Sequence, residues 1–206
     1  MLKKGLLVVI SGPSGAGKGT LCKELLSRND KLKISVSCTT RTPRAGELEG
    51  INYYFVSREK FLEMIQEDAF LEHAEVYDNF YGTPYAGIEK ELEAGNDVIL
   101  EIDIQGALKV KDRHPEGLFI FILPPSMEEL KDRIRKRGSE TEESLLKRFT
   151  SAFKEINYAS RYNYAVVNDE IDDAVKKLEC IIVAEKCRID RVNKTYTYLQ
   201  EGYLNE

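Results

Sequence analysis

The sequence predicts an α/β protein with a mostly parallel sheet flanked by helices. Apolar runs of strand length alternate with stretches that have helical periodicity, the pattern of repeated β-α units. A glycine-rich segment joins the first apolar run to the first helical stretch, which is the arrangement of phosphate-binding α/β proteins. A chain of 206 residues fits one domain or one domain carrying an insertion.

The expected elements follow from periodicity and from helix-start residues. The apolar runs predict strands at 6–11, 33–38, 97–103, 118–123 and 164–168. Helical periodicity predicts helices at 17–28, 105–112, 126–136, 142–160 and 170–187. The segment "PPSMEEL" carries a Ser N-cap with Glu at the third helical position, which is a capping box.

Two segments interrupt this alternation. Residues 39–90 contain short strand-like pieces, turn residues and clustered tyrosines, and we expect them to form an insertion on the parallel core. The charged stretch that begins at residue 135 is too polar for a core, and we expect a lid there. We therefore expect one unit over 1–206, divided as core (about 1–38, 91–134 and 150–206), insertion (about 39–90) and lid (about 135–149).

Composition excludes several classes of protein. The longest apolar runs are far shorter than the ~20 residues that cross a bilayer, so no membrane association is expected. A net charge of -5 argues against nucleic acid as a partner. The four cysteines lack metal-ligand spacing, which favours free thiols in a reducing cytoplasm over a disulfide or metal site.

The glycine-rich segment "SGPSGAGKGT" predicts a phosphate site. Successive glycines let backbone N–H groups converge on one anion, and the following helix adds the positive end of its dipole. The spacing is that of a P-loop, with Lys18 placed to reach the β- and γ-phosphates of a nucleotide. The proposed ATP-binding residues of this segment are Gly12, Pro13, Ser14, Gly15, Ala16, Gly17, Lys18, Gly19 and Thr20.

The metal contact of this loop departs from the usual pattern. The position after Lys18, usually a hydroxyl ligand of Mg²⁺, is Gly19, and Thr20 follows it. Either Thr20 binds the metal, or waters held by carboxylates do. Glu101 and Asp103 supply such carboxylates, because residues two apart on a strand share a face and ligands collect at the carboxyl ends of parallel strands.

Arginines supply further anion contacts. Arg41 and Arg44 lie in the loop "TTRTPRAGE" and suit a second phosphate, with Tyr53 and Tyr81 as neutral donors; solvated arginines and packed tyrosines are the alternatives. A second basic set lies on or beside the lid segment and suits a transferring phosphoryl group, surface salt bridging being the alternative. It comprises Arg133, Arg137 and Arg148. His73 and His114 are expected to be structural or exposed.

Taken together, the motifs resemble those of the guanylate kinases, in the order of that family and over residues 8 to about 169. They are "SGPSGAGKGT", "SVSCTTRTPRAGE", "YYFV", "FLEHAEVYDNFYGTPY", "LEIDIQGA", "PPSMEELKDRIRKRGSETEES" and "VVND". The resemblance implies a P-loop NTPase core, a small mixed GMP-binding insertion and a helical lid. It implies transfer of the γ-phosphoryl group of ATP to GMP with Mg²⁺, in purine nucleotide metabolism and GMP recycling, with dGMP as a further substrate and no obligate protein partner.

The resemblance also implies residue roles. Arg41, Arg44, Tyr53 and Tyr81 match positions that hold the GMP phosphate, and Ser37, Glu72, Thr83 and Asp103 match those that read guanine. Glu101 is placed in the same GMP site, where some relatives have Asp. Lys18, Arg41, Arg137 and Arg148 would stabilise charge on the moving phosphoryl group. Arg133 and Asn168 would contact ATP.

Two rival interpretations stay open from sequence alone. Guanylate-kinase-like domains of some scaffold proteins bind peptides without catalysis, but the intact glycine loop and Lys18 argue against that role. A kinase for another monophosphate is the second rival. Glu72 favours guanine, whose N1–H and exocyclic amine suit one carboxylate, whereas adenine has an acceptor at N1.

Overall fold

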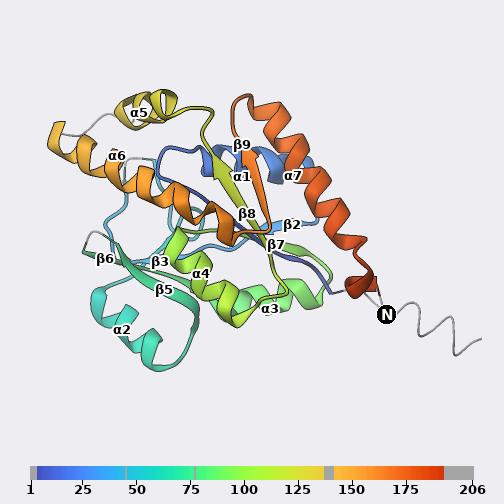
Figure 1. Cartoon of the computed structure of the whole chain (residues 1–206). Coiled ribbons are helices and arrows are strands. Elements are labelled where there is room, and N and C mark those ends of the chain that lie inside the picture. Colours follow the sequence, from blue (N-terminus) through green and yellow to red (C-terminus); the bar gives the residue numbers. More distant parts are fainter. Residues whose placement is uncertain (1–3, 45, 77, 137–141, 193–206) are drawn as a thin grey trace, which may run out of the picture.

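The computed structural model describes residues 4–44, 46–76, 78–136 and 142–192. Its centre is a five-stranded parallel sheet in the order β2-β7-β1-β8-β9 (Figure 1). The strands are β1 (Leu7–Ser11), β2 (Leu32–Ile34), β7 (Asp97–Glu101), β8 (Leu118–Leu123) and β9 (Tyr164–Val167). The predicted α/β fold class with a parallel sheet is confirmed.

Helices cover both faces of this sheet. One core contains residues of β1, β8, β9, α1 (Lys18–Arg28) and α7 (Ile171–Lys186). The other contains residues of β1, β7, α3 (Tyr85–Glu93) and α4 (Ile104–Arg113). Strands that are buried on both faces have near-continuous apolar sequences, which explains why β1 and β8 could be predicted from sequence.

A second, mixed sheet lies beside the first, in the order β4-β3-β6-β5. Its elements are β3 (Cys38–Thr39), β4 (Tyr54–Phe55), α2 (Arg58–Gln66), β5 (Phe70–Val76) and β6 (Asn79–Pro84). A small aromatic core of its own, with Phe61 stacked between Phe70 and Phe80, packs α2 against these strands. Figure 1 shows this sheet and α2 as a separate layer next to α4.

Helices α5 (Met127–Lys136) and α6 (Glu142–Ile156) pack on one another at the edge of the core, with Leu130, Ile134 and Ala152 buried between them. A 3₁₀ turn, η1 (Asn157–Arg161), leads from α6 to β9. The predicted capping box is confirmed at its cap, since Ser126 Oγ accepts from the N–H of Glu129 at 3.1 Å. Within the described residues, no helix combines the length and the apolarity that a bilayer crossing needs.

Four sequence expectations need correction. The strand expected at 97–103 ends at Glu101, and Asp103 is the N-cap of α4, so these two acids do not share one strand face. The strand expected at 33–38 ends at Ile34, and Cys38 already belongs to β3 of the second sheet, so the apolar alternation continued across a change of sheet. The helix expected at 142–160 ends as an α-helix at Ile156. Helices α2 and α3 were missed because their turn residues and tyrosines suggested an irregular segment.

Candidate active site

The glycine-rich segment forms a tight turn between β1 and α1, at the carboxyl end of the central strand. Gly12, Gly15 and Gly17 all have positive φ, a conformation that side chains rarely adopt. Lys18 opens α1 and folds back across the turn, donating to the carbonyl of Gly12 at 2.6 Å. The backbone of this segment therefore has the shape of an anion cradle, with the α1 dipole behind it.

Asn168, at the end of β9, supports the turn from the side. Its Nδ2 donates to the carbonyl of Ala16 at 2.8 Å, and a Cβ on Gly17 would lie 2.3 Å from that nitrogen. Arg133 lies on the outer side, with Nη1 donating to the carbonyl of Asn168 at 3.1 Å and Nε bound to Glu129 at 2.8 Å. Asn168 Oδ1 is buried and has no hydrogen-bond partner among the described residues.

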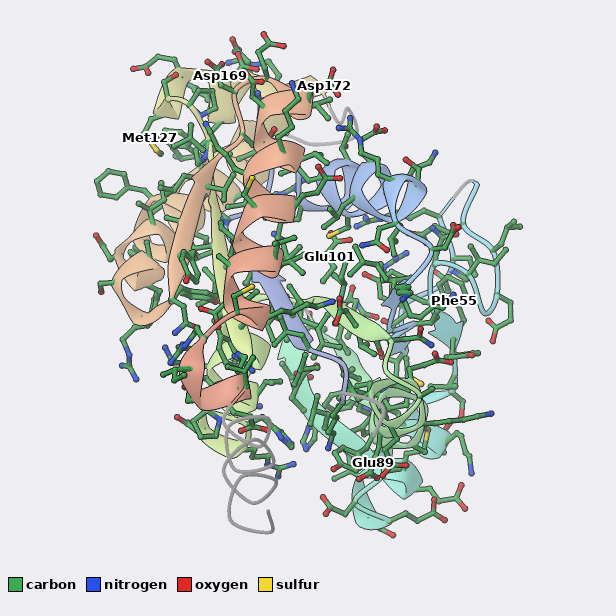
Figure 2. All side chains as sticks on the ribbon, turned by 90° about the vertical axis from the view of Figure 1, so that its right-hand side faces the viewer. Phe55, Glu89, Glu101, Met127, Asp169 and Asp172 are labelled. Carbon is green, nitrogen blue, oxygen red and sulfur yellow. The ribbon has the colours of Figure 1, made fainter. Side chains whose placement is uncertain are left out.

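These residues border a cavity of about 690 Å³ that also includes Gly15, Thr20 and the start of α7. Figure 2 shows Asp169 and Asp172 at the end of the molecule where α7 begins. A nucleoside base and sugar need a cavity of this order, next to a cradle for the phosphates. We call the glycine turn, Arg133, Asn168 and this cavity the loop half of the site.

Helix α6 reaches the same turn from the opposite direction. Arg148 Nη2 donates to Ser14 Oγ at 2.8 Å, so one predicted arginine does lie on the cradle. Glu155, about two helical turns further along, has its pKa raised by burial, an effect that Lys18 and a hydrogen bond to the Ser14 backbone oppose. The predicted Arg137 lies outside the described residues.

Glu101, at the end of β7, faces Gly19 directly. A Cβ on Gly19 would lie 3.3 Å from Glu101 Oε1, so the carboxylate takes up room beside the place where other loops carry a hydroxyl residue. Thr20 is exposed on the outer side of α1 and borders the large cavity. Glu101 at the end of β7 thus places a carboxylate oxygen beside the cradle, while Thr20 lies on the exposed outer side of α1.

The second half of the site lies on the small sheet and centres on Glu72 of β5. Its side chain is 6% exposed, and Oε1 accepts from Thr83 Oγ1 on β6 at 2.7 Å. Thr83 in turn lies 3.4 Å from Ser37 Oγ, which connects the three predicted guanine-contacting residues in one chain of polar groups. Three segments distant in sequence therefore meet at one buried carboxylate.

The environment of Glu72 raises its pKa towards neutrality. Burial raises the pKa of Glu72 to about 7, with a smaller contribution of the same sign from Asp103, while Thr83 and Lys109 oppose the shift. Asp103 is the N-cap of α4, and its Oδ1 accepts from the N–H of Gly106 at 2.9 Å. A Cβ on Gly106 would lie 2.6 Å from Glu72 Oε2, so only glycine lets the carboxylate approach the first turn of α4.

A cationic and aromatic cluster lies on the same sheet. The Arg41 guanidinium lies 5.6 Å from the centre of the Tyr53 ring, which packs edge-on against Tyr81 at 6.0 Å. Arg41 is held by Glu47 at 2.9 Å. Burial lowers the pKa of Arg41, but hydrogen bonds to Glu47 and Tyr81 raise it by more. The net effect is a pKa above the ordinary value of arginine, so the guanidinium stays charged. Three of the four predicted phosphate-binding residues are therefore together.

The fourth predicted phosphate-binding residue, Arg44, is exposed, and its backbone N–H donates to Glu47 Oε2 at 2.8 Å.

The two halves of the site approach each other at this cluster. Burial raises the pKa of Tyr53, and the negative charge of Glu101 adds to the shift, so the tyrosine lies within electrostatic reach of the carboxylate beside Gly19. We call Glu72, its polar partners and the Arg41 cluster the sheet half of the site.

Sequence reasoning missed two acids of the site. Glu47 bonds Arg41 and the Arg44 backbone, and its place three residues after Arg44 in the same loop was the available signal. Glu155 lies seven residues after Arg148 on α6, a spacing that brings both side chains to one helix face. Glu47 is the acid partner of a predicted arginine, whereas Glu155 lies beside Ser14 and within electrostatic reach of Lys18.

A glycine cradle at the carboxyl end of a parallel sheet, with a second arginine and tyrosine cluster facing it, is the arrangement of P-loop kinases that act on a small phosphorylated substrate. The sequence profile of the guanylate kinase family matches residues 4–185. The chain belongs to the guanylate kinase family.

Individual relatives agree with this assignment. A guanylate kinase of Clostridium perfringens is 64% identical over 203 residues, which are 98% of this chain and 94% of the relative. One from Caldanaerobacter subterraneus is 63% identical and covers 97% of each chain. The crystal structure of guanylate kinase from Anaplasma phagocytophilum superimposes with a TM-score of 0.77 at 37% identity, over 92% of this chain and 90% of the other.

Proposed function

We propose that the loop half binds ATP, that the sheet half binds GMP, and that the two phosphate chains meet between Lys18 and Arg41. The chain is an ATP:GMP phosphotransferase, which transfers the γ-phosphoryl group of ATP to GMP and releases ADP and GDP. What is proposed is the division of this work among the residues of the two halves.

One observation carries the proposal for GMP: a buried carboxylate, Glu72, with one oxygen bonded to Thr83. Guanine presents N1–H and an exocyclic amine side by side, and a carboxylate accepts both. Adenine presents an acceptor at N1, so its binding would leave the buried acid and the base unpaired. Ser37 and Asp103 complete the base contacts in this proposal, because Ser37 continues the polar chain and Asp103 lies within electrostatic reach of Glu72.

The GMP phosphate would bind at the Arg41 cluster. Arg41 is charged and held in place, and Tyr53 and Tyr81 add hydroxyl donors around it. Arg44 joins them when its exposed side chain turns towards the anion. Guanidinium groups suit this role because they bind phosphate through paired donors. Glu101, close enough to influence Tyr53, lies at the boundary between GMP and ATP.

On the ATP side, the backbone N–H groups of Gly12–Thr20 would hold the phosphates, with Lys18 neutralising the β- and γ-groups. The adenine would occupy the cavity lined by Arg133 and Asn168. The buried Asn168 Oδ1, which has no partner among the described residues, is an acceptor suited to an exocyclic amine. Arg148, bound to Ser14, would stabilise the transferring group, and we extend this role to Arg137.

The chemistry requires no side-chain nucleophile, because a phosphate oxygen of GMP attacks the γ-phosphorus directly. The protein therefore acts by aligning two phosphates and by surrounding the transition state with positive charge. Among the residues that the structure describes, we assign Lys18, Arg41 and Arg148 to supply this positive charge. Exclusion of water matters equally, since water would otherwise accept the phosphoryl group.

We propose that Mg²⁺ accompanies ATP. The Glu101 carboxylate fits such an ion, because it lies beside Gly19 at the start of α1. Glu101 would hold it through water, and Thr20 would join as a ligand when its exposed hydroxyl turns from the outer side of α1 towards the phosphates. Held there, Mg²⁺ would offset the negative charge that develops on the phosphates during transfer.

We also propose a division of labour along the chain: an insertion over about 39–90 for GMP, a lid over about 135–149, and a core made of the remainder. The small sheet with its own aromatic core supports the first assignment. The contact between Arg148 and Ser14 supports the second, because it joins the lid segment to the cradle. We further propose dGMP as a substrate, a cytoplasmic location and no obligate protein or nucleic-acid partner, consistent with the free cysteines and the net charge of -5.

The test is ADP formation from Mg-ATP with GMP, dGMP, AMP, CMP and UMP, for the wild type and for Glu72→Gln. The wild type should use GMP and dGMP. In the variant, kcat/KM for GMP should fall by about 10³-fold, because an amide cannot accept both guanine donors. Glu89→Gln, an exposed change on α3, serves as the control and should match the wild type. Full GMP activity in Glu72→Gln would refute the assignment of the base site.

A further inference from the structure

Strand β5, which carries Glu72, is an edge strand of the small sheet, and its free side faces α4. Backbone carbonyls on a free edge need other partners. Two basic side chains of α4 supply them. Lys109 Nζ donates to the carbonyl of His73, and Arg113 Nη1 donates to the carbonyl of Leu71 at 3.1 Å.

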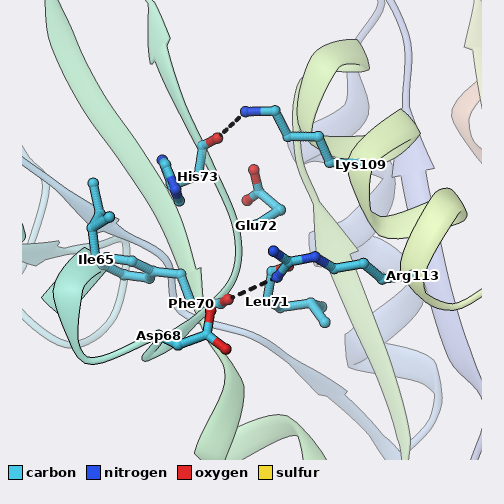
Figure 3. Close-up of a pocket in the computed structure, with 8 residues that line it drawn as sticks. All are labelled: Ile65, Asp68, Phe70, Leu71, Glu72, His73, Lys109 and Arg113. Atoms are coloured by element: carbon cyan, nitrogen blue, oxygen red, sulfur yellow. Dashed lines mark hydrogen bonds between the residues drawn. The ribbon is translucent and has the colours of Figure 1, made fainter.

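These bonds bracket Glu72. Figure 3 shows the Glu72 side chain between the two dashed bonds. Its carboxylate approaches the first turn of α4, because a Cβ on Gly106 would lie 2.6 Å from Glu72 Oε2. A small cavity of about 180 Å³ separates the strand from the helix at this point. The strand is thus joined to α4 by charged donors immediately on either side of the residue proposed to read the base.

Helix α4 is itself fixed in the protein core. Ala107 and Val110 are buried among strands of the large sheet, and Leu71 of β5 packs in the same cluster. The helix begins at Asp103, which caps its first turn. One rigid element therefore carries a proposed base contact at its start and two donors to the base-reading strand further along.

The charges around Glu72 come from every element packed against it. Helix α4 contributes Lys109 and Arg113, and its N-cap is Asp103. Strand β6 contributes the hydroxyl of Thr83, and His73 and Asp68 line the cavity on the β5 side. Lys109 lowers the pKa of Glu72, against burial and Asp103. Burial lowers the pKa of His73, and the positive charges of Lys109 and Arg113 add to this shift, which disfavours the charged imidazole.

We propose that Lys109 and Arg113 are positioning residues for guanine recognition, holding the edge of β5 so that the Glu72 carboxylate stays aligned with the base. The proposal rests on the proposed function of Glu72 as the base-reading acid. Neither side chain touches GMP or ATP in this account. Their effect reaches the substrate only through the position and charge of Glu72.

A simple structural role would be an alternative, since any bond between strand and helix adds stability. Lys111 provides the matched control. It lies on the same helix and also donates from Nζ to a backbone carbonyl, but the acceptor is Arg161 in η1 rather than β5. Its replacement removes the same charge and the same kind of bond without releasing the Glu72 strand.

The experiment measures kcat and both KM values from pH 5.5 to 8.5 for Lys109→Met, Arg113→Met, the double variant and Lys111→Met. We expect KM for GMP to rise about threefold in each single variant and about tenfold in the double variant, since a charged hydrogen bond is lost each time. KM for ATP should stay within about twofold of wild type.

The pH profile separates the charge effect. GMP recognition requires ionised Glu72, so kcat/KM for GMP falls as pH decreases through the Glu72 pKa. Removing the Lys109 charge should move the midpoint of that fall to higher pH, and Lys109→Arg should restore it. Arg113→Met should raise KM for GMP with less change in the midpoint, because Arg113 does not contribute to the Glu72 pKa shift.

Equal kinetics for Lys109→Met and wild type, or equal losses for Lys109→Met and Lys111→Met, would overturn the proposal. Thermal unfolding of each variant shows whether it is folded, and Lys109→Arg keeps the test valid if Lys109→Met unfolds. Failure of wild type to phosphorylate GMP would instead refute the proposed function, so the two failures are distinguishable.

Discussion

The phosphate cradle of the loop half and the base contacts of the sheet half are built from different parts of the polypeptide. The cradle uses one short segment, Gly12–Thr20, and its shape comes from backbone torsions at three glycines. The base contacts use side chains of Ser37, Glu72 and Thr83, which lie on different strands or loops and meet only when the small sheet forms. In the proposed site, the ATP phosphates are thus held by local main chain, and guanine by side chains that the fold brings together.

This difference follows from what each ligand requires. Phosphate is a symmetric anion that any nucleotide carries, and converging N–H groups with one lysine suffice for it. Guanine differs from adenine only in the placement of donors and acceptors, so its recognition needs a particular acid in a dry setting. The loop half should therefore determine rate and the sheet half selectivity, and each can be disturbed without the other.

The largest separation is expected from Lys18→Met. In the proposed site the lysine neutralises the β- and γ-phosphates, and its loss should lower kcat by about 10³-fold. The KM for GMP should change little, because the hydrogen bonds of Lys18 to the carbonyls of Gly12 and Pro13 lie within the loop half. Steady-state kinetics measures both, with Lys23→Met on the exposed face of α1 as the control. A rise in the KM for GMP as large as the fall in kcat would show that the two halves of the site cannot be disturbed separately.

Gly17→Ala tests whether the loop half depends on main-chain shape. Gly17 has φ +89, and an added Cβ would meet Asn168 Nδ2 at 2.3 Å. We expect the free energy of unfolding to fall by about 1–3 kcal/mol and the KM for ATP to rise by about 10²-fold. Chemical denaturation and ATP titration provide the measurements.

The control for that variant is Gly87→Ala. Gly87 lies inside α3, and nothing lies within 4 Å of its added Cβ, so alanine should leave ATP kinetics unchanged and raise stability by up to about 1 kcal/mol. If Gly17→Ala behaved like Gly87→Ala, the loop geometry would not be what holds the phosphates.

Mild acid should affect the sheet half selectively. With the pKa of Glu72 raised to about 7, the carboxylate is protonated below that pH and loses the ability to accept two guanine donors. GMP binding should therefore weaken about tenfold between pH 7.5 and pH 6, while the KM for ATP changes less. The sign is that of a group needed in its ionised form, so affinity is lost as pH falls.

The GMP phosphate also titrates, near pH 6. Calorimetric binding of guanosine, which carries the base without the phosphate, isolates the contribution of Glu72. A guanosine affinity that does not depend on pH between 6 and 7.5 would contradict the assigned role of its carboxylate.

The same contrast explains what the sequence revealed about the fold. Strands β1 and β8 are buried on both faces and appear as uninterrupted apolar runs, so the parallel core was predictable. The small sheet has strands as short as two residues, with the aromatic core supplied by α2 and β5, and this arrangement arises from tertiary contacts. Local propensity gives little information about such elements.

The site divides in the same way. The glycine loop could be predicted from spacing alone, because all its residues are consecutive. Glu72, Ser37 and Thr83 required the family resemblance, since nothing in their local sequence shows that they meet. Glu47 and Lys109 were not predicted at all, because one is the partner of an arginine and the other acts across a strand edge.

Among the tests of the contrast between the two halves, the smallest effect is expected at Thr83, which bonds Glu72 Oε1 at 2.7 Å. Thr83→Val removes the hydroxyl while nearly preserving the volume, so the acid loses a donor and its pKa should rise. We expect kcat/KM for GMP to fall about fivefold at pH 7.5, with the midpoint of its pH profile displaced upward. Thr83→Ser keeps the hydroxyl and should stay within about twofold of wild type. Equal activities of the valine and serine variants would mean that Glu72 is held by the shape of its pocket, and that the sheet half, like the loop half, relies mainly on backbone geometry.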